Sequence, residues 1–197
     1  MNDFILSTFL TTNTGIDAKI ADDIINKQKR MVVEKGELLL KEGEICRHSF
    51  FVEKGLLRYY SIDAKGKEHI IQFAPEGWFV SDRESVYFNQ PSQYFIQALE
   101  ESRIIALDET FVRELAKQDP SFLEFNNRLL HNHIRHLQRR INMLLSATAE
   151  ERYLDFINIY PDILLRVPQT MVASYLGIAP ESLSRVRKDL AMKNFKG

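Results

Sequence analysis

Residues 167–190 read VPQTMVASYLGIAPESLSRVRKDL, and this stretch decides how the C-terminal part of the chain folds. Pro168 is typical of the start of a helix, and Gly177 is typical of a helix end that takes a left-handed backbone before a sharp turn. Pro180 predicts the start of a second helix, with Ala179 at its N-cap position. The stretch therefore predicts two short helices joined by a tight turn.

The apolar residues of this stretch are spaced so that the two helices share one core, formed by Val172, Leu176, Ile178, Leu183 and Val186. Ala173 is small at the point where the second helix must approach the first. This arrangement is typical of a helix-turn-helix, whose second helix lies in the major groove of DNA and meets base edges with its N-terminal half. Leu183, Val186 and Leu190 are predicted to bury one face of that helix.

The polar residues of the second helix have the chemistry needed to read DNA. Arg185 can donate two hydrogen bonds to O6 and N7 of guanine, and Glu181 can accept one from N4 of cytosine. Further candidates for phosphate or base contacts are Ser182, Lys188, Gln169 and Thr170. Each of these residues alone would pass for an ordinary surface residue. The prediction depends on their shared position opposite an apolar face.

The distribution of charge also favours a polyanionic partner. The whole chain has a net charge of -1, but residues 1–117 carry 15 basic and 19 acidic residues, whereas residues 118–197 carry 11 and 8. Beyond residue 184 one acid, Asp189, accompanies five basic residues: Arg185, Arg187, Lys188, Lys193 and Lys196. A solvated basic tail is the alternative. Because this tail continues the second helix, we interpret it as part of a DNA-binding surface.

A heptad pattern precedes the helix-turn-helix. After a short helix predicted near 109–117, Asp119 and Pro120 predict the start of a helix that continues to about Leu145. Steps of four and three residues, typical of a coiled-coil seam, connect Leu123, Asn127, Leu130, Ile134, Leu137, Ile141 and Leu144. We predict a homodimer through this seam, in which Asn127 fixes the register. The alternative, packing on the chain's own barrel, is assigned to a neighbouring stripe of Phe122, Phe125 and Leu129.

Composition excludes several other classes of protein. Cys46 is the single cysteine, so an intrachain disulfide, an iron-sulfur cluster and a zinc ribbon are excluded. Among the histidines of the long helix only His133 and His136 share a face, and no carboxylate lies at ligand spacing, so we expect no metal. No apolar run approaches the roughly 20 residues that cross a bilayer, and no signal peptide is evident. We expect a soluble, cytoplasmic protein.

The N-terminal part is rich in short β-prone runs, at 32–33, 38–40, 50–52, 56–60, 69–73 and 104–107. Glycines that suit turns with positive φ recur between them, at Gly36, Gly43, Gly55, Gly66 and Gly77. Residues 63–67 (DAKGK) are the clearest hairpin turn. We predict an antiparallel barrel or sandwich of about eight strands with no intervening helix. One short amphipathic helix precedes it, carrying Ile16, Ile20, Ile24 and Ile25.

The β-roll, the long helix and the helix-turn-helix together resemble the Crp/Fnr family of bacterial transcription regulators, over about residues 20–195. The matching stretches are 43–44 (GE), 50–55 (FFVEKG), 66–68 (GKE) and 77–79 (GWF) in the roll, and Ala173, 176–177 (LG) and 181–185 (ESLSR) in the helix-turn-helix. The resemblance implies a homodimer that binds a palindromic DNA operator, contacts RNA polymerase, and positions its two reading helices in response to an effector in the roll.

The expected fold is α+β. It comprises an antiparallel β-roll of the double-stranded jelly-roll type as a cyclic-nucleotide-binding-like sensor (1–117), a dimerisation helix (118–147), and a winged-helix-like helix-turn-helix domain (148–197). The wing is expected to be truncated, because the chain ends at Gly197, seven residues after Leu190.

The roll departs from the family members that bind cyclic nucleotides. Ser81-Asp82 stands where those members have Gly-Glu, and Ser92-Gln93 stands where they have the phosphate-binding Arg followed by Ser or Thr. Loss of that charge-assisted pair costs roughly 1.5 to 3 kcal/mol, so we expect no cyclic AMP and no other cofactor. An unknown effector would meet Trp78, Ser81, Asp82, Arg83, Ser92 and Gln93. Arg83 either restores an anion site or points outward.

Two other functions remain as alternatives. A small-ligand-binding module could signal through protein partners without DNA, although the predicted exposed face of Glu181, Arg185 and Lys188 argues against it. A roll-shaped enzyme of the cupin kind needs about three histidines and a carboxylate inside the barrel. The strands supply only His69, with His48 at their edge, so we do not expect an enzyme.

Overall fold

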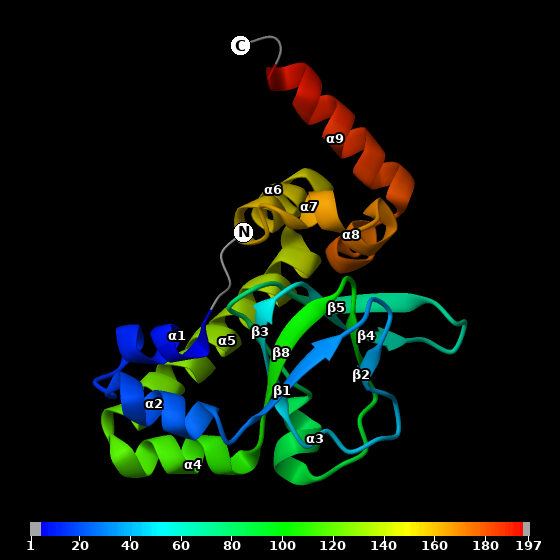
Figure 1. The fold of residues 1–197 in the computed structure, drawn as a ribbon. Coiled ribbons are helices and arrows are strands. Elements are labelled where there is room, and N and C mark those ends of the chain that lie inside the picture. Colours follow the sequence, from blue (N-terminus) through cyan, green and yellow to red (C-terminus); the bar gives the residue numbers. More distant parts are fainter. Residues whose placement is uncertain (1–4, 195–197) are drawn as a thin grey trace. The chain divides into compact units, whose positions relative to one another are not determined.

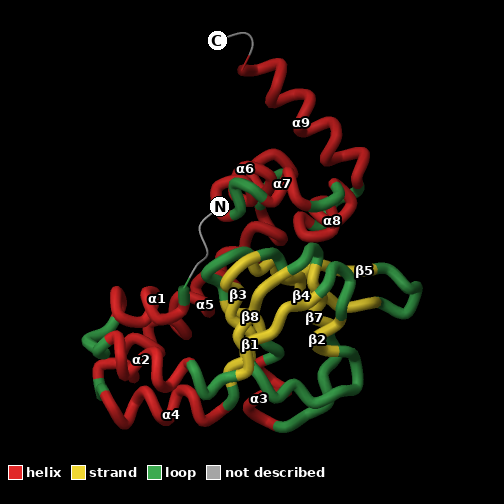
Figure 2. The backbone as a smooth tube through the Cα atoms, in the orientation of Figure 1, coloured by secondary structure: helices red, strands yellow, loops and turns green. Residues whose placement is uncertain are grey.

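The computed structural model describes residues 5–194, and these divide into two compact units (Figures 1 and 2). The N-terminal unit comprises the described residues up to Leu130, with the exception of 68–70. The C-terminal unit takes 68–70 and the residues from His131 onward. Helix α5 (Ser121–Ser146) contributes to both units. The division into three functional segments at residues 117 and 147 stays a prediction.

The strands of the N-terminal part form two four-stranded sheets, in the orders β1-β8-β3-β6 and β2-β7-β4-β5. They are β1 (Lys29–Val33), β2 (Leu38–Leu40), β3 (Ser49–Lys54), β4 (Leu57–Ile62), β5 (Glu68–Ala74), β6 (Phe79–Val80), β7 (Phe95–Ala98) and β8 (Ser102–Leu107). In the first sheet β8 pairs antiparallel with both β1 and β3, so that Met31 and Val52 both lie opposite Ile104. The predicted antiparallel roll of about eight strands is confirmed for the described residues.

Apolar side chains between the two sheets form the core of the roll. Fully buried examples from both sheets are Val52, Leu57, Ile96 and Ile104, and Trp78 packs partly buried against them. The alternation of inward and outward side chains in a strand explains why Leu57 is in this core whereas its neighbour Arg58 bonds to Gln97 on the other face of the sheet.

Four helices of the N-terminal unit share a second core: α1 (Leu6–Asn13), α2 (Ala18–Ile25), α4 (Glu109–Gln118) and the first turns of α5. Phe122 and Phe125 of α5 are buried there, and Leu129 packs at its edge. Phe51, Ile105 and Leu107 of the strands belong to the same core, so the prediction that this stripe packs on the chain's own barrel is confirmed. Helix α2 matches the expected amphipathic helix and is capped by the Asp17 carboxylate, whereas α1 was not predicted.

The prediction that no helix interrupts the strands is wrong. Helix α3 (Arg83–Phe88) lies between β6 and β7, and Asp82 is its N-cap. With only six residues, α3 is too short to show a helical apolar period. Strands β6 and β7 were not predicted either. Sequence reasoning did identify the turns, because the five glycines between the strands all have positive φ, from 76° to 99°.

Gly55 illustrates why one of these turns requires glycine. A Cβ at this position would lie 2.2 Å from Oγ of Ser102 and 2.7 Å from its Cα. The predicted hairpin turn at 63–67 is also confirmed. The Asp63 carboxylate accepts hydrogen bonds from the N–H groups of Lys65 and Lys67, at 2.9 and 3.0 Å.

The C-terminal unit is helical. After the last turns of α5 come α6 (Ala149–Ile159), α7 (Ile163–Arg166), α8 (Gln169–Leu176) and α9 (Pro180–Asn194). Helix α5 begins within one residue of its predicted start, and the Asp119 carboxylate accepts from the N–H of Ser121. Helix α6 begins with a capping box between Thr148 and Glu151. Helix α7 was not predicted. The residues after Asn194, where a truncated wing is expected, lie outside the described residues.

In the part of the chain that the structure describes, none of the helices combines the length and the apolar content required to cross a membrane.

Candidate nucleic-acid interface

Helices α8 and α9 meet at the tight turn that the sequence predicts. Gly177 has φ 64°, and its N–H donates to the carbonyl of Ser174 at 3.1 Å. The N–H of Ile178 then donates to the carbonyl of Ala173 at 3.0 Å. These bonds satisfy carbonyl groups at the end of α8 that have no partner within the helix. A Cβ at Gly177 would also lie 3.1 Å from Cδ2 of Leu144, so both backbone and space favour glycine.

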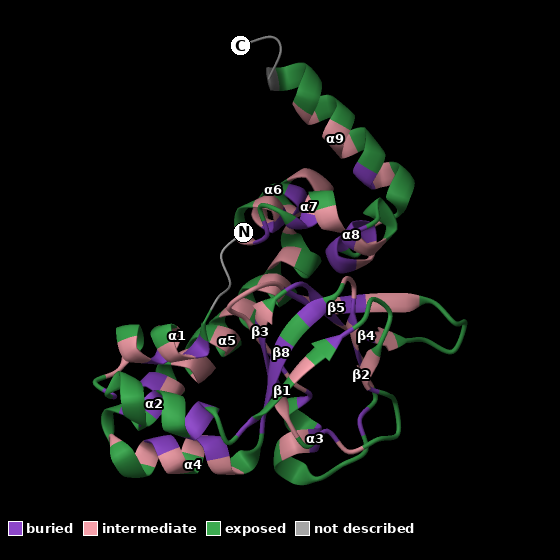
Figure 3. Ribbon diagram, in the orientation of Figure 1, coloured by how far each residue is buried: buried purple, intermediate pink, exposed green. Residues whose placement is uncertain are grey.

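One side of α9 is anchored by apolar contacts. Leu183 is fully buried, as are Val172 and Ala173 of α8, whereas Val186 and Leu190 are half-buried (Figure 3). The carbonyl of Ala179 accepts from the N–H groups of Ser182 and Leu183, so α9 begins at Pro180 as predicted. The predicted apolar backing of α9 is therefore present, and it is tightest at Leu183.

The opposite side of α9 carries the candidate DNA-reading residues. Glu181, Arg185 and Lys188 are exposed, and Ser182 is half-buried. Across residues 5–194 none of the three charged groups has an ion-pair partner within the chain. At the start of α8, Pro168 is the N-cap and both Gln169 and Thr170 are exposed. The structure thus leaves these side chains available to a partner.

Fewer cations of the basic tail are available to a partner than the sequence suggests. Lys193 forms a salt bridge with Glu150 at the start of α6, with Nζ 2.8 Å from Oε1. Arg187 is half-buried, and Lys196 lies outside the described residues. Because Lys193 pairs with Glu150 at the far end of α9, the cations that face solvent in the first half of this helix are Arg185 and Lys188.

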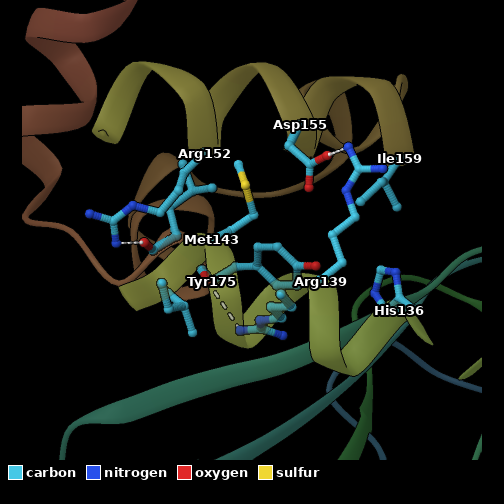
Figure 4. Close-up of a pocket in the computed structure, with 10 residues that line it drawn as sticks. His136, Arg139, Met143, Arg152, Asp155, Ile159 and Tyr175 are labelled. Carbon is cyan, nitrogen blue, oxygen red and sulfur yellow. Dashed lines mark hydrogen bonds and ion pairs between the residues drawn. The ribbon is translucent and has the colours of Figure 1, made fainter. Parts of the chain in front are cut away.

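Two arginines outside the motif fasten the first helix of the pair. Arg140 of α5 donates to the carbonyl of Tyr175 at 3.1 Å, and Arg152 of α6 donates to the carbonyl of Leu176 at 2.9 Å (Figure 4). The Arg140 guanidinium also lies 3.8 Å from the centre of the Tyr175 ring. Cations are favourable at a helix C-terminus, where carbonyl groups lack partners. Sequence reasoning missed both residues, because they come from helices outside the motif.

The same region holds a group of charges around His136. Arg139 pairs with Asp155, and both line a cavity together with His136 (Figure 4). Burial lowers the pKa of His136 below its usual value, and Arg140 lowers it further, whereas Asp155 acts in the opposite direction. No carboxylate was expected near this histidine; the fold supplies one from α6. Among the described residues, no three His, Cys, Asp or Glu side chains are grouped as a metal site.

The heptad seam of α5 is largely uncovered in the single chain. Ile134 and Ile141 are 49% and 56% exposed, and other exposed seam members are Leu123, Asn127, Leu137 and Leu144; Leu130 is half-buried. Leu145, which the heptad analysis left out, is 82% exposed and directly follows the seam. A row of exposed apolar side chains on one helix is typical of a surface that binds a protein partner.

In the roll, two of the predicted effector residues meet each other. The Ser92 hydroxyl donates to the Asp82 carboxylate at 2.6 Å, and both side chains are buried. The other carboxylate oxygen accepts from the N–H groups of Glu84 and Ser85, at 3.1 and 3.3 Å. Asp82 therefore caps helix α3 and binds Ser92 at the same time.

The remaining candidates of the roll are dispersed. Arg83 is exposed, with its guanidinium 5.0 Å above the ring of Tyr87, so of the two orientations considered for it the structure has the outward one. Gln93 is exposed, and Trp78 and Ser81 are half-buried. Tyr59 was missed by sequence reasoning; burial and the neighbouring Asp82 raise the pKa of its hydroxyl.

Comparison with known proteins agrees with this architecture. Residues 30–119 match the family of cyclic nucleotide-binding domains. Electron transport regulator A of Shewanella oneidensis and the fumarate and nitrate reduction regulatory protein of Vibrio cholerae are each 28% identical to this chain over 176 residues, which make up 84% of this chain and 69% of each relative.

Among solved structures, FixK2 from Bradyrhizobium japonicum matches with a TM-score of 0.71 at 18% identity, covering 85% of this chain and 86% of that one. That similarity establishes the fold. The sequence relatives are named as regulators, so the chain is similar to regulatory proteins in both fold and sequence.

Proposed function

We propose that the protein is a homodimeric transcription regulator that recognises a specific DNA sequence with helix α9. The observation that carries this proposal is the two-sided character of α9: Leu183 is fully buried, while Glu181 and Arg185 on the other side face solvent. A helix entering the major groove needs such a rigid apolar backing and an exposed polar face at its N-terminal half. Arg185 would contact guanine and Glu181 cytosine.

Phosphate contacts complete the proposed interface. Gln169 and Thr170 are exposed at the N-terminus of α8, where free backbone N–H groups and the helix dipole attract anions. Lys188 and Ser182 lie on α9 beside the base-reading residues. Such contacts fix the position of a protein on the duplex, and they leave the choice of sequence to the base-edge contacts.

The dimer in this proposal forms through the exposed seam of α5, extended by Leu145. Two copies related by a two-fold axis would present two α9 helices to half-sites about 34 Å apart, one turn of B-DNA. The operator is therefore expected to be palindromic. Contact with RNA polymerase, implied by the family resemblance, belongs to the same proposal.

The roll is proposed to act without cyclic AMP. A cyclic phosphate would need a cation near Ser92, and instead the buried group beside Ser92 is the Asp82 carboxylate, which would repel it. The exposed position of Arg83 supports the same view, since its guanidinium lies at the surface over the ring of Tyr87.

Selection of bound fragments from random duplex DNA tests the regulator proposal directly. The expected result is a palindrome whose half-site centres are one turn apart. Failure to enrich any sequence would contradict sequence-specific binding and would favour a module that signals through protein partners. In a separate calorimetric titration, cyclic AMP is expected to give no binding heat, and a micromolar dissociation constant would overturn the assignment of the roll.

A further inference from the structure

A small, partly open cavity lies in the C-terminal unit, between the end of α5, helix α6 and helix α8 (Figure 4). Its volume is about 20 Å³. A cavity of this size holds one water molecule or one monatomic ion, and no organic effector fits it. The lining residues all belong to this one unit. The size of the cavity therefore limits the ligand to a water-sized species.

The lining carries more positive than negative charge. Arg139, Arg140 and Arg152 line the cavity, and Asp155 is the carboxylate among the lining residues. Because Asp155 already pairs with Arg139, the charges of Arg140 and Arg152 are not balanced by an acid of the lining. Apolar side chains of Met143, Leu144 and Ile159 complete the wall and lower the local dielectric constant, which strengthens any attraction to an anion.

The hydrogen-bonding groups of the cavity are dominated by donors. Arg152 uses Nη1 to donate to Leu176, but its Nε–H is buried and finds no acceptor in the part of the chain that the structure describes. The carbonyl of Tyr175 already accepts from Arg140. A water molecule here would have to share acceptors that already bond to arginines, which are the carbonyls of Tyr175 and Leu176 and the Asp155 carboxylate. A monatomic anion only accepts, so it suits this lining better.

From this geometry we infer that the cavity is a binding site for a monovalent inorganic anion, for which chloride is the abundant physiological example. The anion accepts from Nε–H of Arg152 and lies in the positive field of Arg140. Since these two arginines hold the C-terminal end of α8, the bound anion reduces their mutual repulsion and stabilises the attachment of α8 to α5 and α6. This inference does not depend on DNA binding.

Thermal unfolding in two sodium salts of equal ionic strength tests the site. Chloride fits the cavity, whereas gluconate is far too large. The expected result is a midpoint about 3 °C higher in chloride than in gluconate, with a saturable dependence on chloride concentration. Equal midpoints in the two salts, or a difference that grows without saturation, would overturn the proposal.

Two matched variants separate specific binding from general effects of salt. Arg152→Lys keeps the charge and removes the Nε–H, and it is expected to lose the chloride-dependent shift. Arg135→Lys, at an exposed position of α5, is expected to keep it. A shift of equal size in both variants would contradict the assignment to this cavity.

Bromide provides a measurement that does not require a variant to fold. Crystals of the full chain grown in sodium bromide are expected to show an anomalous scattering peak within hydrogen-bond distance of Arg152 Nε. A peak elsewhere only, or density that refines as water in this cavity, would overturn the proposal.

Discussion

Two helix starts in this molecule have acidic residues nearby and use them in opposite ways. At α3, the N-cap Asp82 turns its carboxylate onto its own helix and onto Ser92, so the acid is buried. At α9, the N-cap position holds Ala179, which has no side-chain acceptor, and the nearby Glu181 is exposed. A polar side chain at a helix start is available to a partner only where the fold does not already use it.

The difference explains why the candidate residues on α9 are accessible to a ligand, whereas two of those in the roll are not. Effector residues in the roll were proposed from their alignment with a family motif, and the two that meet are engaged with each other. DNA-reading residues were proposed from their position opposite an apolar face, and they remain exposed. Five predictions test the two units, from the largest expected effect to the smallest.

The first prediction disrupts the proposed dimer, which would bring two copies of α9 to one operator. Ile134→Asp with Ile141→Asp places two carboxylates in the seam, where burial without a partner is costly. We expect monomers in sedimentation and operator binding weaker by about 100-fold or more, because the second α9 no longer binds at high effective concentration. Asn132→Asp with Gln138→Asp, at exposed positions off the seam, is the control and should remain dimeric. A dimer that survives the seam changes would exclude the seam.

The second prediction removes the buried carboxylate of Asp82. Asp82→Ala removes the cap of α3 and leaves the buried Ser92 hydroxyl without its acceptor, so the roll should lose about 2 to 3 kcal/mol. Trp78 is the single tryptophan and packs against the core of the roll, so its fluorescence in urea reports this unit selectively. Glu84→Ala, an exposed acid in the same turn, should cost under about 0.5 kcal/mol. Equal losses in the two variants would show that the Asp82 bonds carry no special weight.

The third prediction concerns the outward-turned side of α9. Arg185→Ala should weaken binding to the selected operator by about 1 to 3 kcal/mol and relax the preference for one guanine in each half-site. Lys65→Ala, in the exposed hairpin turn of the roll, is a basic-residue control and should leave binding unchanged. Quantitative binding to a set of single-base operator variants measures both effects. An unchanged base preference at every position would remove Arg185 from the interface.

The fourth prediction gives α9 a side-chain N-cap like that of α3. Ala179→Ser supplies α9 with the side-chain cap that α3 already has, and the protein should gain about 0.5 to 1 kcal/mol. Ala191→Ser, exposed near the other end of α9, provides no cap and should lower stability slightly. Urea unfolding followed by circular dichroism compares the two. A loss of stability in Ala179→Ser would mean that the backbone at residue 179 does not suit a capping serine.

The fifth prediction has the smallest expected effect and concerns pH. Burial lowers the pKa of His136, so the folded state favours the neutral ring. Its contribution to stability is present above the unfolded pKa of about 6.5 and is lost as the pH falls below that value. His136→Gln should therefore reduce the loss of stability between pH 7 and 5, whereas the exposed His131→Gln should not. A steeper loss in His136→Gln would reverse the assigned sign.

Local sequence patterns predicted those parts of the fold that depend on local chemistry. Glycines marked the turns because positive φ is costly for other residues, and the pair of Gly177 and Pro180 located the turn between α8 and α9. Asp119 and Pro120 located the start of α5 to within one residue. These features involve neighbours in the chain, so a single sequence contains the needed information.

Features that depend on distant neighbours were not accessible in this way. Arg140 and Arg152 come from two helices and meet the end of a third, so no spacing in the sequence connects them. The two-residue strand β6 exists because β3 lies beside it, with Phe51 opposite Phe79. The sequence could not determine the role of Asp82, because a carboxylate at this position can either bind an effector or cap a helix. The structure shows that it caps α3.

The contact between Leu144 and Gly177 has a consequence for how this sequence can diverge. Leu144 belongs to the seam that we assign to dimerisation, and one of its methyl groups borders the glycine of the turn before α9. A bulkier residue at either position would clash with the residue at the other. Selection for dimerisation at position 144 and selection for DNA recognition at position 177 would therefore constrain each other. We expect homologous chains to change these two positions together, and a designer who alters dimer specificity near the end of α5 must re-examine the loop that aims the reading helix.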